Sequence, residues 1–325
     1  MRTLRVVGNR LLQAVLMVLA VVVLNFLLIH LAPGDPVSTI AGESGGMSPE
    51  LMEQLRAQYG LDKPLITQLG VYLGKAIQGD LGFSYYFNLP VTDLIIERIP
   101  ATILLVVSAI LCAFIIGTAL GVLSSRKPNG AMSQFVTLLS MVGFAAPVFW
   151  TGIMLVILFA SLIPILPVAG MHGTAASREG LEGMLDVLMH LVLPVTSLAL
   201  VYIAQYSRVS RSSMLDVLGS DFIRTARAKG LSTRIVLYKH ALRNALLPVV
   251  TLLGLQFGNV LSGAILVETV FNWPGLGRLA FDSVLRRDYP MLLGLLLVSS
   301  IVVILMNLIT DLCYRFIDPR IKVRG

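Results

Sequence analysis

Residues 101–123 read ATILLVVSAILCAFIIGTALGVL, an apolar run that contains no Asp, Glu, Lys or Arg. A helix needs about 20 apolar residues to cross the hydrocarbon core of a bilayer, so this run is long enough to span a membrane. Five further charge-free runs occur, at roughly 11–31, 135–163, 187–206, 245–267 and 291–310. The pattern predicts an all-α integral membrane protein with six transmembrane helices.

The composition of the whole chain agrees with a membrane location. Of 325 residues, 56% are hydrophobic and 13% are charged, against roughly 25% charged residues in an ordinary soluble domain. The mean hydropathy is +0.84. The net charge of +7 is a weak argument for nucleic-acid binding, because only 7% of the residues are aromatic and most of these lie within apolar segments. These values exclude a soluble chain and disfavour a nucleic-acid-binding protein.

Basic residues are unequally divided between the segments that alternate along the chain. The N-terminus, residues 124–134 and 207–244, and the C-terminus together hold 17 Lys and Arg, whereas the other three connecting segments hold 8. Because cytoplasmic segments carry the excess of Lys and Arg, both termini are predicted to face the cytoplasm. The first apolar run is longer than a signal-peptide core and no cleavage site follows it, so we expect it to be retained.

Small residues spaced four apart predict close packing between transmembrane helices. Gly117 and Gly121 form one such pair in the second run, and Gly254, Gly258 and Ser262 form a stripe in the fifth. Glycines without a packing role, as in many membrane helices, are the alternative.

Two prolines and two polar residues mark other special positions within the runs. Pro147 and Pro194 each remove a helical hydrogen bond, so we expect kinks in the third and fourth helices. Gln256 and Asn259 are polar at mid-depth of the fifth run. They are expected either to contact a neighbouring helix or to line a water-filled path.

The segment 32–100 is too long for a plain connector and carries helix signals of its own. Ser48 can cap a first short helix that Gly60 would end, residues 64–77 predict a second, and Thr92 can cap a third. These helices form either a docking platform for an external partner or a layer lying at the membrane interface.

The segment 207–244 is basic and predicts two short helices separated by Gly230, an arrangement that we call the elbow. Ser220 or Asp221 can cap the first helix, and Ser232 can cap the second. The apolar residues expected to share one side of each helix are Phe222, Ile223 and Ala226, then Ile235, Val236, Leu237 and Ala241. Such an elbow suits a groove on another protein, and a basic loop held against anionic lipid is the alternative.

No set of residues predicts catalysis or metal binding. Residues 42–46, GESGG, match G-x-S-x-G, but Ser44 lies in a polar stretch without the strand-to-helix setting that this motif requires. The candidate metal ligands His30, His172, His190, His240, Cys112 and Cys313 are far apart and lack metal-site spacing. We therefore predict no catalytic residue and no metal site, and a chain that is not an enzyme.

An energy source is also missing from the chain. No G-x-x-x-x-G-K-[ST] motif occurs. Ion-coupled carriers usually hold ionisable residues within their transmembrane helices, whereas here Asp311 only borders the sixth run and His190, near the outer end of the fourth, is the sole other candidate. If the chain transports a solute uphill, the energy is expected to come from a different polypeptide, and the elbow is where it would arrive.

Several motifs together resemble one family. Residues 224–230 (RTARAKG) and 239–248 (KHALRNALLP) resemble the cytoplasmic coupling loop of the permease subunits of ABC importers for dipeptides, oligopeptides, glutathione and nickel. Four more motifs carry the same resemblance in the same order, at 30–36 (HLAPGDP), 78–82 (QGDLG), 272–278 (NWPGLGR) and 287–290 (RDYP). The wider ABC-importer loop signature, E-A-A-x-x-x-G followed by I-x-L-P, is matched only in part.

The departures from that signature are specific. Ala226 and Gly230 fit it, but Arg224 and Thr225 replace Glu-Ala, and Arg243 stands where proline would follow. These departures resemble the sequence of the peptide-permease branch of the family. They bear on individual contacts of the coupling loop more than on its coupling role.

The resemblance implies the fold of a type I ABC importer permease. An N-terminal transmembrane helix and an outer helical segment would occupy 1–100, and a five-helix core with the coupling loop would occupy 101–325. The residues that the resemblance places in ATPase coupling are Asp221, Phe222, Arg224, Thr225, Ala226, Arg227, Lys229, Gly230 and Leu231.

The resemblance also implies partners and a location. The partners would be a second homologous permease, two ABC ATPase subunits that carry ATP and Mg²⁺, an external solute-binding protein and membrane lipid. The chain itself would bind no cofactor and would lie in the bacterial plasma membrane. The expected solute is a small peptide-like molecule. A nickel- or glutathione-specific member of the family and an ion-coupled secondary transporter are the alternatives.

Overall fold

A computed structural model describes residues 2–31, 48–58, 62–84, 86–173 and 180–317. The chain divides into two compact units. The first comprises Met1–Pro100 and Leu279–Leu305, and the second comprises Ala101–Arg278 and Met306–Gly325.

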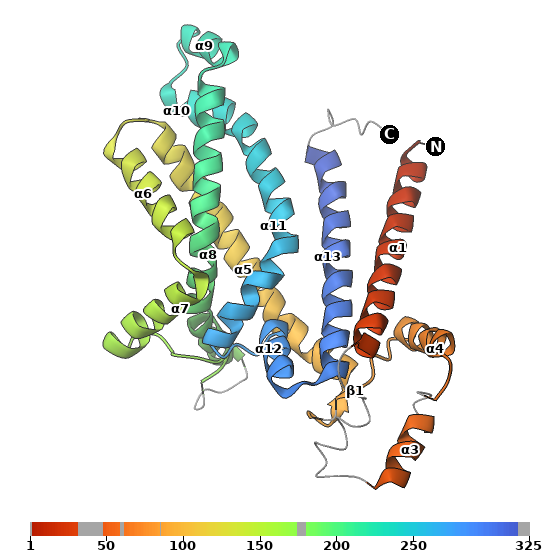
Figure 1. The fold of residues 1–325 in the computed structure, drawn as a ribbon. Coiled ribbons are helices and arrows are strands. Elements are labelled where there is room, and N and C mark those ends of the chain that lie inside the picture. The colour runs from red at the N-terminus through yellow and green to blue at the C-terminus, as the bar shows by residue number, and fades with distance from the viewer. Residues whose placement is uncertain (1, 32–47, 59–61, 85, 174–179, 318–325) are drawn as a thin grey trace. The chain divides into compact units, whose positions relative to one another are not determined.

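The first unit contains helices and one short hairpin (Figure 1). Its elements are α1 (Arg2–Leu31), α3 (Pro49–Gln58), α4 (Leu65–Ile77), β1 (Phe83–Ser84), β2 (Leu89–Pro90), the start of α5 (Val91–Ser125), the end of α12 (Leu276–Arg286) and most of α13 (Tyr289–Ile317). The strands are antiparallel, with Phe83 opposite Pro90. Ser84 and Asp288 are buried and hydrogen-bonded to each other, so they join the hairpin to the start of α13.

The second unit contains the rest of α5 and the helices around α8. These are α6 (Ala131–Ala145), α7 (Val148–Val156), the π-helix η1 (Ile157–Leu162), α8 (Gly180–Leu218), α9 (Asp221–Ala228), α10 (Thr233–Ile235), the π-helix η2 (Val236–Ala241) and α11 (Leu242–Val270). The long helix α8 contacts α6, α7 and α11 (Figure 1). Apolar side chains of α5, α8 and α11 form its main core, together with Phe271 and Trp273.

The predicted all-α membrane class is confirmed, and helices cover the six predicted runs. Among the described residues, three helices are long and apolar enough to cross a membrane, namely Val91–Ser125, Gly180–Leu218 and Tyr289–Met306. The pair Ala131–Ala145 and Val148–Leu162 makes a fourth if the bent pair is one span. The apolar stretch Leu12–Leu28 of α1 is shorter.

The third run is not the single kinked helix that the sequence predicts. It breaks at Pro147, where α6 and the helix that follows meet at 103°. Ala146 is extended, with ψ of 128°, because the proline ring disfavours helical geometry in the preceding residue. Pro194, in contrast, lies inside the continuous helix α8.

Gly117 and Gly121 of α5 lie directly against α8. A Cβ atom at Gly117 would stand 2.7 Å from the Cβ of Tyr206, and one at Gly121 would stand 2.5 Å from the Cβ of Ser210. Real carbon atoms do not approach this closely, so the two backbones can only meet at glycine. For the stripe in α11, the surroundings of Gly258 and Ser262 lie outside the described side chains.

The helix signals of residues 32–100 are partly confirmed. The Ser48 hydroxyl accepts the Leu51 N–H at 3.3 Å at the start of α3, and α4 matches the second predicted helix. The third predicted helix forms, but as the first turns of α5 and not as a separate helix. Thr92 was wrongly expected to cap it, because Thr92 lies in the first turn of α5 and donates its hydroxyl to the Gly79 carbonyl at 2.6 Å. The predicted stop at Gly60 lies outside the described residues, as do residues 42–46.

Candidate coupling site

The elbow forms two consecutive helical pieces at one end of the second unit (Figure 1). After α8, Ser220 takes an extended conformation and α9 begins at Asp221. The helix ends at Ala228. Gly230 follows two residues later, with a φ of +75° and an N–H that donates to the Arg227 carbonyl at 2.9 Å. Glycine reaches this left-handed conformation without a steric penalty, which explains the stop.

The chain returns from the elbow as one continuous helical path, not as a separate second helix. α10 starts after Ser232 and continues through η2 into α11. Pro248 therefore lies inside α11. The second half of the elbow is thus the first part of a long helix.

One face of the elbow is fixed to the rest of the second unit. Ile223 and Ala226 of α9 are buried in an apolar cluster. The other buried members of this cluster are Val122, Met214, Val236, Leu237, Ala241 and Ala245. They come from α5, α8, η2 and α11, so a displacement of α9 acts on three long helices through close-packed side chains.

The rest of the elbow surface is exposed and carries both apolar and charged groups. Phe222 is 47% exposed and Leu231 is 36% exposed. Asp221 and Arg224 form a solvent-exposed ion pair at 3.3 Å. The expectation that Phe222 shares the buried side was wrong, because residues advance about 100° around a helix and Phe222 falls at the edge of the buried face.

The remaining residues assigned to coupling divide between these two faces. Thr225, Arg227 and Lys229 are exposed, and the Thr225 hydroxyl donates to the Asp221 carbonyl at 3.0 Å. Ala226 is buried in the cluster. Its side chain therefore holds α9 in place and is not available to a partner.

Of the two polar residues in the fifth run, the structure describes the side chain of Gln256 but not that of Asn259. Gln256 is 5% exposed and its side-chain amide donates to the Gln205 side-chain oxygen at 2.5 Å. This bond joins α11 to α8 inside the apolar part of the unit. The side chain of Asn259 lies outside the described side chains.

A buried carboxylate that the sequence analysis missed organises the motif at 272–278. Glu268 is fully buried, and its two oxygens accept the Thr102 hydroxyl at 2.7 Å and the Arg278 N–H at 3.0 Å. The Trp273 ring nitrogen donates to the Ala101 carbonyl at 2.8 Å. Its position in the sequence could have indicated this role. Glu268 directly follows the apolar run 245–267 and stands four residues before the motif at 272–278.

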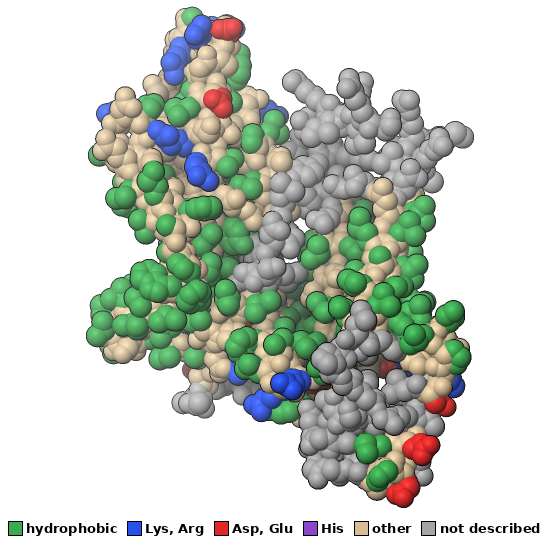
Figure 2. Space-filling model, viewed as in Figure 1, with side chains coloured by type: hydrophobic (Ala, Val, Ile, Leu, Met, Phe, Trp, Pro, Cys, Tyr) green, Lys and Arg blue, Asp and Glu red, His purple; other side chains and the backbone are tan. Residues whose placement is uncertain are grey.

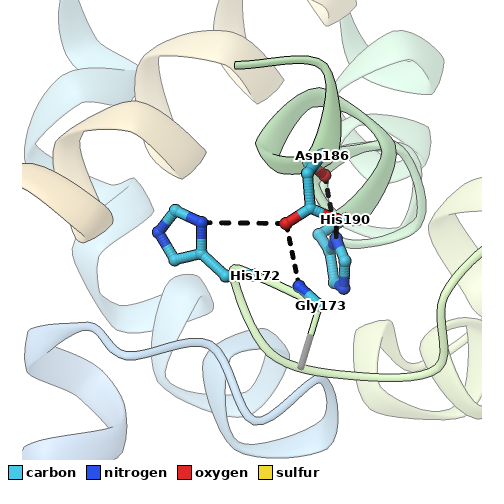
Figure 3. A network of polar contacts seen from close by, with 4 residues as sticks. All are labelled: His172, Gly173, Asp186 and His190. Carbon is cyan, nitrogen blue, oxygen red and sulfur yellow. Dashed lines mark hydrogen bonds and ion pairs between the residues drawn. The ribbon is translucent and has the colours of Figure 1, made fainter. Parts of the chain in front are cut away.

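Two histidines that are far apart in the sequence meet at one carboxylate. Asp186 accepts the Gly173 N–H at 2.8 Å and lies 3.2 Å from the Nδ1 atom of His190 and 3.8 Å from the Nδ1 atom of His172 (Figure 3). Among the described residues, no group of three or more His, Cys, Asp or Glu is arranged to hold a metal ion. The contacts fasten the segment before α8 to its first turns.

Two protein-family models together match nearly the whole chain. A model described as the binding-protein-dependent transport system inner membrane component matches residues 117–323, and a model of the N-terminal part of such membrane components matches residues 3–106. The boundary between the two models falls close to Ala101, where the second compact unit begins.

Curated relatives match over almost their full length. The chain is 41% identical to the dipeptide transport system permease protein DppB of Escherichia coli over 321 residues, covering 94% of each chain. It is 38% identical to the oligopeptide transport system permease protein AppB of Bacillus subtilis over 319 residues, covering 97% of this chain and 98% of the relative.

A solved structure shares the fold. The MetNI methionine ABC transporter in an inward-facing conformation aligns with a TM-score of 0.55 at 15% identity, over 69% of this chain and 96% of the other. At this identity the likeness concerns the fold alone. From the family models and the close relatives, the chain belongs to the binding-protein-dependent transport system inner membrane components and is a permease subunit of an ABC importer.

Proposed function

We propose that this chain forms half of the translocation pathway of a peptide importer and that a separate ATPase drives it through the elbow. The substrate class is supported by the names of the relatives, which are dipeptide and oligopeptide permeases. A small peptide-like solute therefore has better support than nickel or glutathione.

The structure of the elbow is the observation that supports the coupling role. Phe222, Arg224 and Leu231 are exposed, whereas Ile223 and Ala226 lie in a cluster shared with α5, α8 and α11. An exposed amphipathic face can enter a cleft of an ATPase, and the buried face transmits the movement to long helices. Alternating access then follows as the helices move between two packed arrangements.

The proposed assembly contains a second homologous permease, two ABC ATPase subunits and an external solute-binding protein. ATP and Mg²⁺ bind to the ATPase subunits, and this chain binds no cofactor. Both termini face the cytoplasm of a bacterium, which places the elbow on the side where ATP is available. The excess of Lys and Arg in the N-terminus, the elbow and the C-terminus supports this orientation.

The substitution Phe222→Ala tests the coupling role with little risk to the fold, because the side chain is 47% exposed. A central apolar residue in a docking groove commonly contributes 2 kcal/mol or more, so we expect about 30-fold weaker binding of the ATPase subunits. Binding is measured by pull-down from detergent, and peptide uptake is measured in vesicles.

A matched control is Phe135→Ala in α6, where the phenylalanine is 57% exposed and distant from the elbow in sequence. This variant is expected to retain ATPase binding and uptake. Wild-type ATPase binding and uptake in Phe222→Ala would contradict a docking role for the exposed face.

A further inference from the structure

A cavity of about 520 Å³ lies beside the elbow, within the second compact unit. It is bounded by the end of α5, the start of α6, the end of α8, α9, α10 and η2. The lining residues are Leu123, Arg126, Lys127, Met132, Leu218, Arg227, Thr233, Val236 and Leu237. Of the exposed residues of α9, Arg227 lines the cavity, whereas Asp221, Phe222 and Arg224 do not.

The cavity combines an apolar floor with three cations. Val236 and Leu237 are buried at its base. Arg126, Lys127 and Arg227 are exposed, and within the described residues their side chains form no ion pair or hydrogen bond. None of the described lining residues is acidic. The positive charge gathered here is therefore not neutralised by the chain in the described region.

The position of the cations along the helices fits the level of lipid headgroups. Leu123 is the last residue of the apolar run 101–123, and Arg126 follows three residues later, about 5 Å along a helix axis. Basic side chains directly beyond a transmembrane segment lie among the headgroups. Leu123 and Met132 are 37% and 48% exposed at the cavity rim, as suits contact with acyl chains.

Arg227 is exposed and lies at the edge of the buried face of α9. It is four residues after the fully buried Ile223, so the two side chains lie on the same side of the helix. Figure 2 shows Lys and Arg side chains over α9 and the neighbouring end of this unit, while hydrophobic side chains cover α6 and α7. The cavity thus combines an apolar rim with three exposed cations.

We propose that this cavity binds the phosphate headgroup of one anionic phospholipid. Arg126 and Lys127 reach the headgroup from the turn between α5 and α6, and Arg227 reaches it from α9. The lipid joins this turn to the elbow, which no ion pair does within the described residues. The apolar rim favours a lipid over the acidic surface of a protein partner, because such a surface would leave Leu123 and Met132 uncovered.

Native mass spectrometry tests this site on the full chain, purified with the subunits that accompany it and titrated with phosphatidylglycerol or phosphatidylcholine. Each Lys or Arg near a headgroup contributes enough that the double variant Arg126→Gln and Lys127→Gln is expected to bind the first phosphatidylglycerol about 30-fold more weakly. Each single substitution is expected to weaken it about 5-fold. Binding of phosphatidylcholine should not change.

The matched control is the double variant Arg234→Gln and Lys239→Gln, which removes two exposed cations of the elbow that do not line the cavity. It should keep the wild-type affinity for phosphatidylglycerol. The proposal is overturned if the two double variants lose affinity equally, or if millimolar inorganic phosphate displaces the bound lipid. It is also overturned if Arg126→Gln and Lys127→Gln leave lipid binding unchanged and weaken only the binding of ATPase subunits.

Discussion

At the scale of single residues, Gly230 sets the direction of the elbow through its backbone alone. Its φ is +75°, and a Cβ atom placed there would meet no other atom within 4 Å. Space is therefore available for a side chain, and only the left-handed backbone conformation opposes one. A substitution of Gly230 therefore changes the backbone conformation of the elbow without creating a steric clash, so it tests the role of the elbow's shape.

The substitution Gly230→Val is expected to abolish peptide uptake and transport-coupled ATP hydrolysis while leaving membrane insertion intact. A β-branched residue in the left-handed region costs about 1–3 kcal/mol, so α9 will end differently and its exposed face will be reoriented. Uptake and ATP hydrolysis in reconstituted vesicles measure the effect.

Gly230→Asn supplies the control, because asparagine tolerates the left-handed region far better than valine does. It should retain most of the uptake. If Gly230→Val imports peptide at the wild-type rate, the shape of the elbow does not matter for coupling.

Glu268 shows what the sequence could not reveal at this scale. Its position after an apolar run is visible in the sequence, but its partners are Thr102, 166 residues away, and the backbone of Arg278. A fully buried carboxylate requires such hydrogen bonds, and only the fold brings them together. The motif at 272–278 was therefore recognised without the acid that holds it.

At the scale of helices, the apolar runs predicted where helices form but not how each proline acts. Pro147 breaks the third run, whereas Pro194 and Pro248 lie inside α8 and α11. A tertiary contact accompanies the break, since the Ser197 hydroxyl of α8 donates to the Val148 carbonyl at 3.1 Å. This contact holds the first turn of α7 against α8, and the local sequence carries no sign of it.

The contact between α5 and α8 gives a prediction at the same scale. In Gly121→Leu, the new Cβ would stand 2.7 Å from the Ser207 backbone oxygen, so the helices must separate. Overpacking of this kind typically costs about 1–3 kcal/mol or more, and we expect a lower thermal midpoint in detergent and less monodisperse protein.

Gly74→Leu in α4 is the matched control, because a Cβ at Gly74 meets nothing within 4 Å. It should keep the thermal midpoint of the wild type. A similar loss of stability in both variants would show that the cost comes from removing a helical glycine and not from the contact between α5 and α8.

At the scale of the whole molecule, the sequence predicted the class and the membrane location because both follow from composition and run length. The turn at Gly230 was also predictable, since it is a local signal. The predicted capping was wrong in part, because Ser220 and Ser232 stand at N-cap positions without a side-chain capping hydrogen bond. The direction of Phe222 was not predictable, because it depends on which side of α9 meets the cluster around Met214. Local sequence signals thus predicted where the helices form. Tertiary packing determined which faces of these helices stay exposed and available to partner proteins.

The absence of a nucleotide-binding motif in the sequence leads to a prediction about energy. Vesicles that contain this chain alone should not accumulate peptide against a gradient. Vesicles that contain the assembled importer, with its ATPase subunits and binding protein, should accumulate peptide only when ATP is supplied. An ionophore should leave the ATP-driven uptake unchanged, because the apolar runs contain no Asp, Glu, Lys or Arg of the kind that ion-coupled carriers usually hold. Accumulation by the chain alone that collapses with the ionophore would instead identify an ion-coupled carrier.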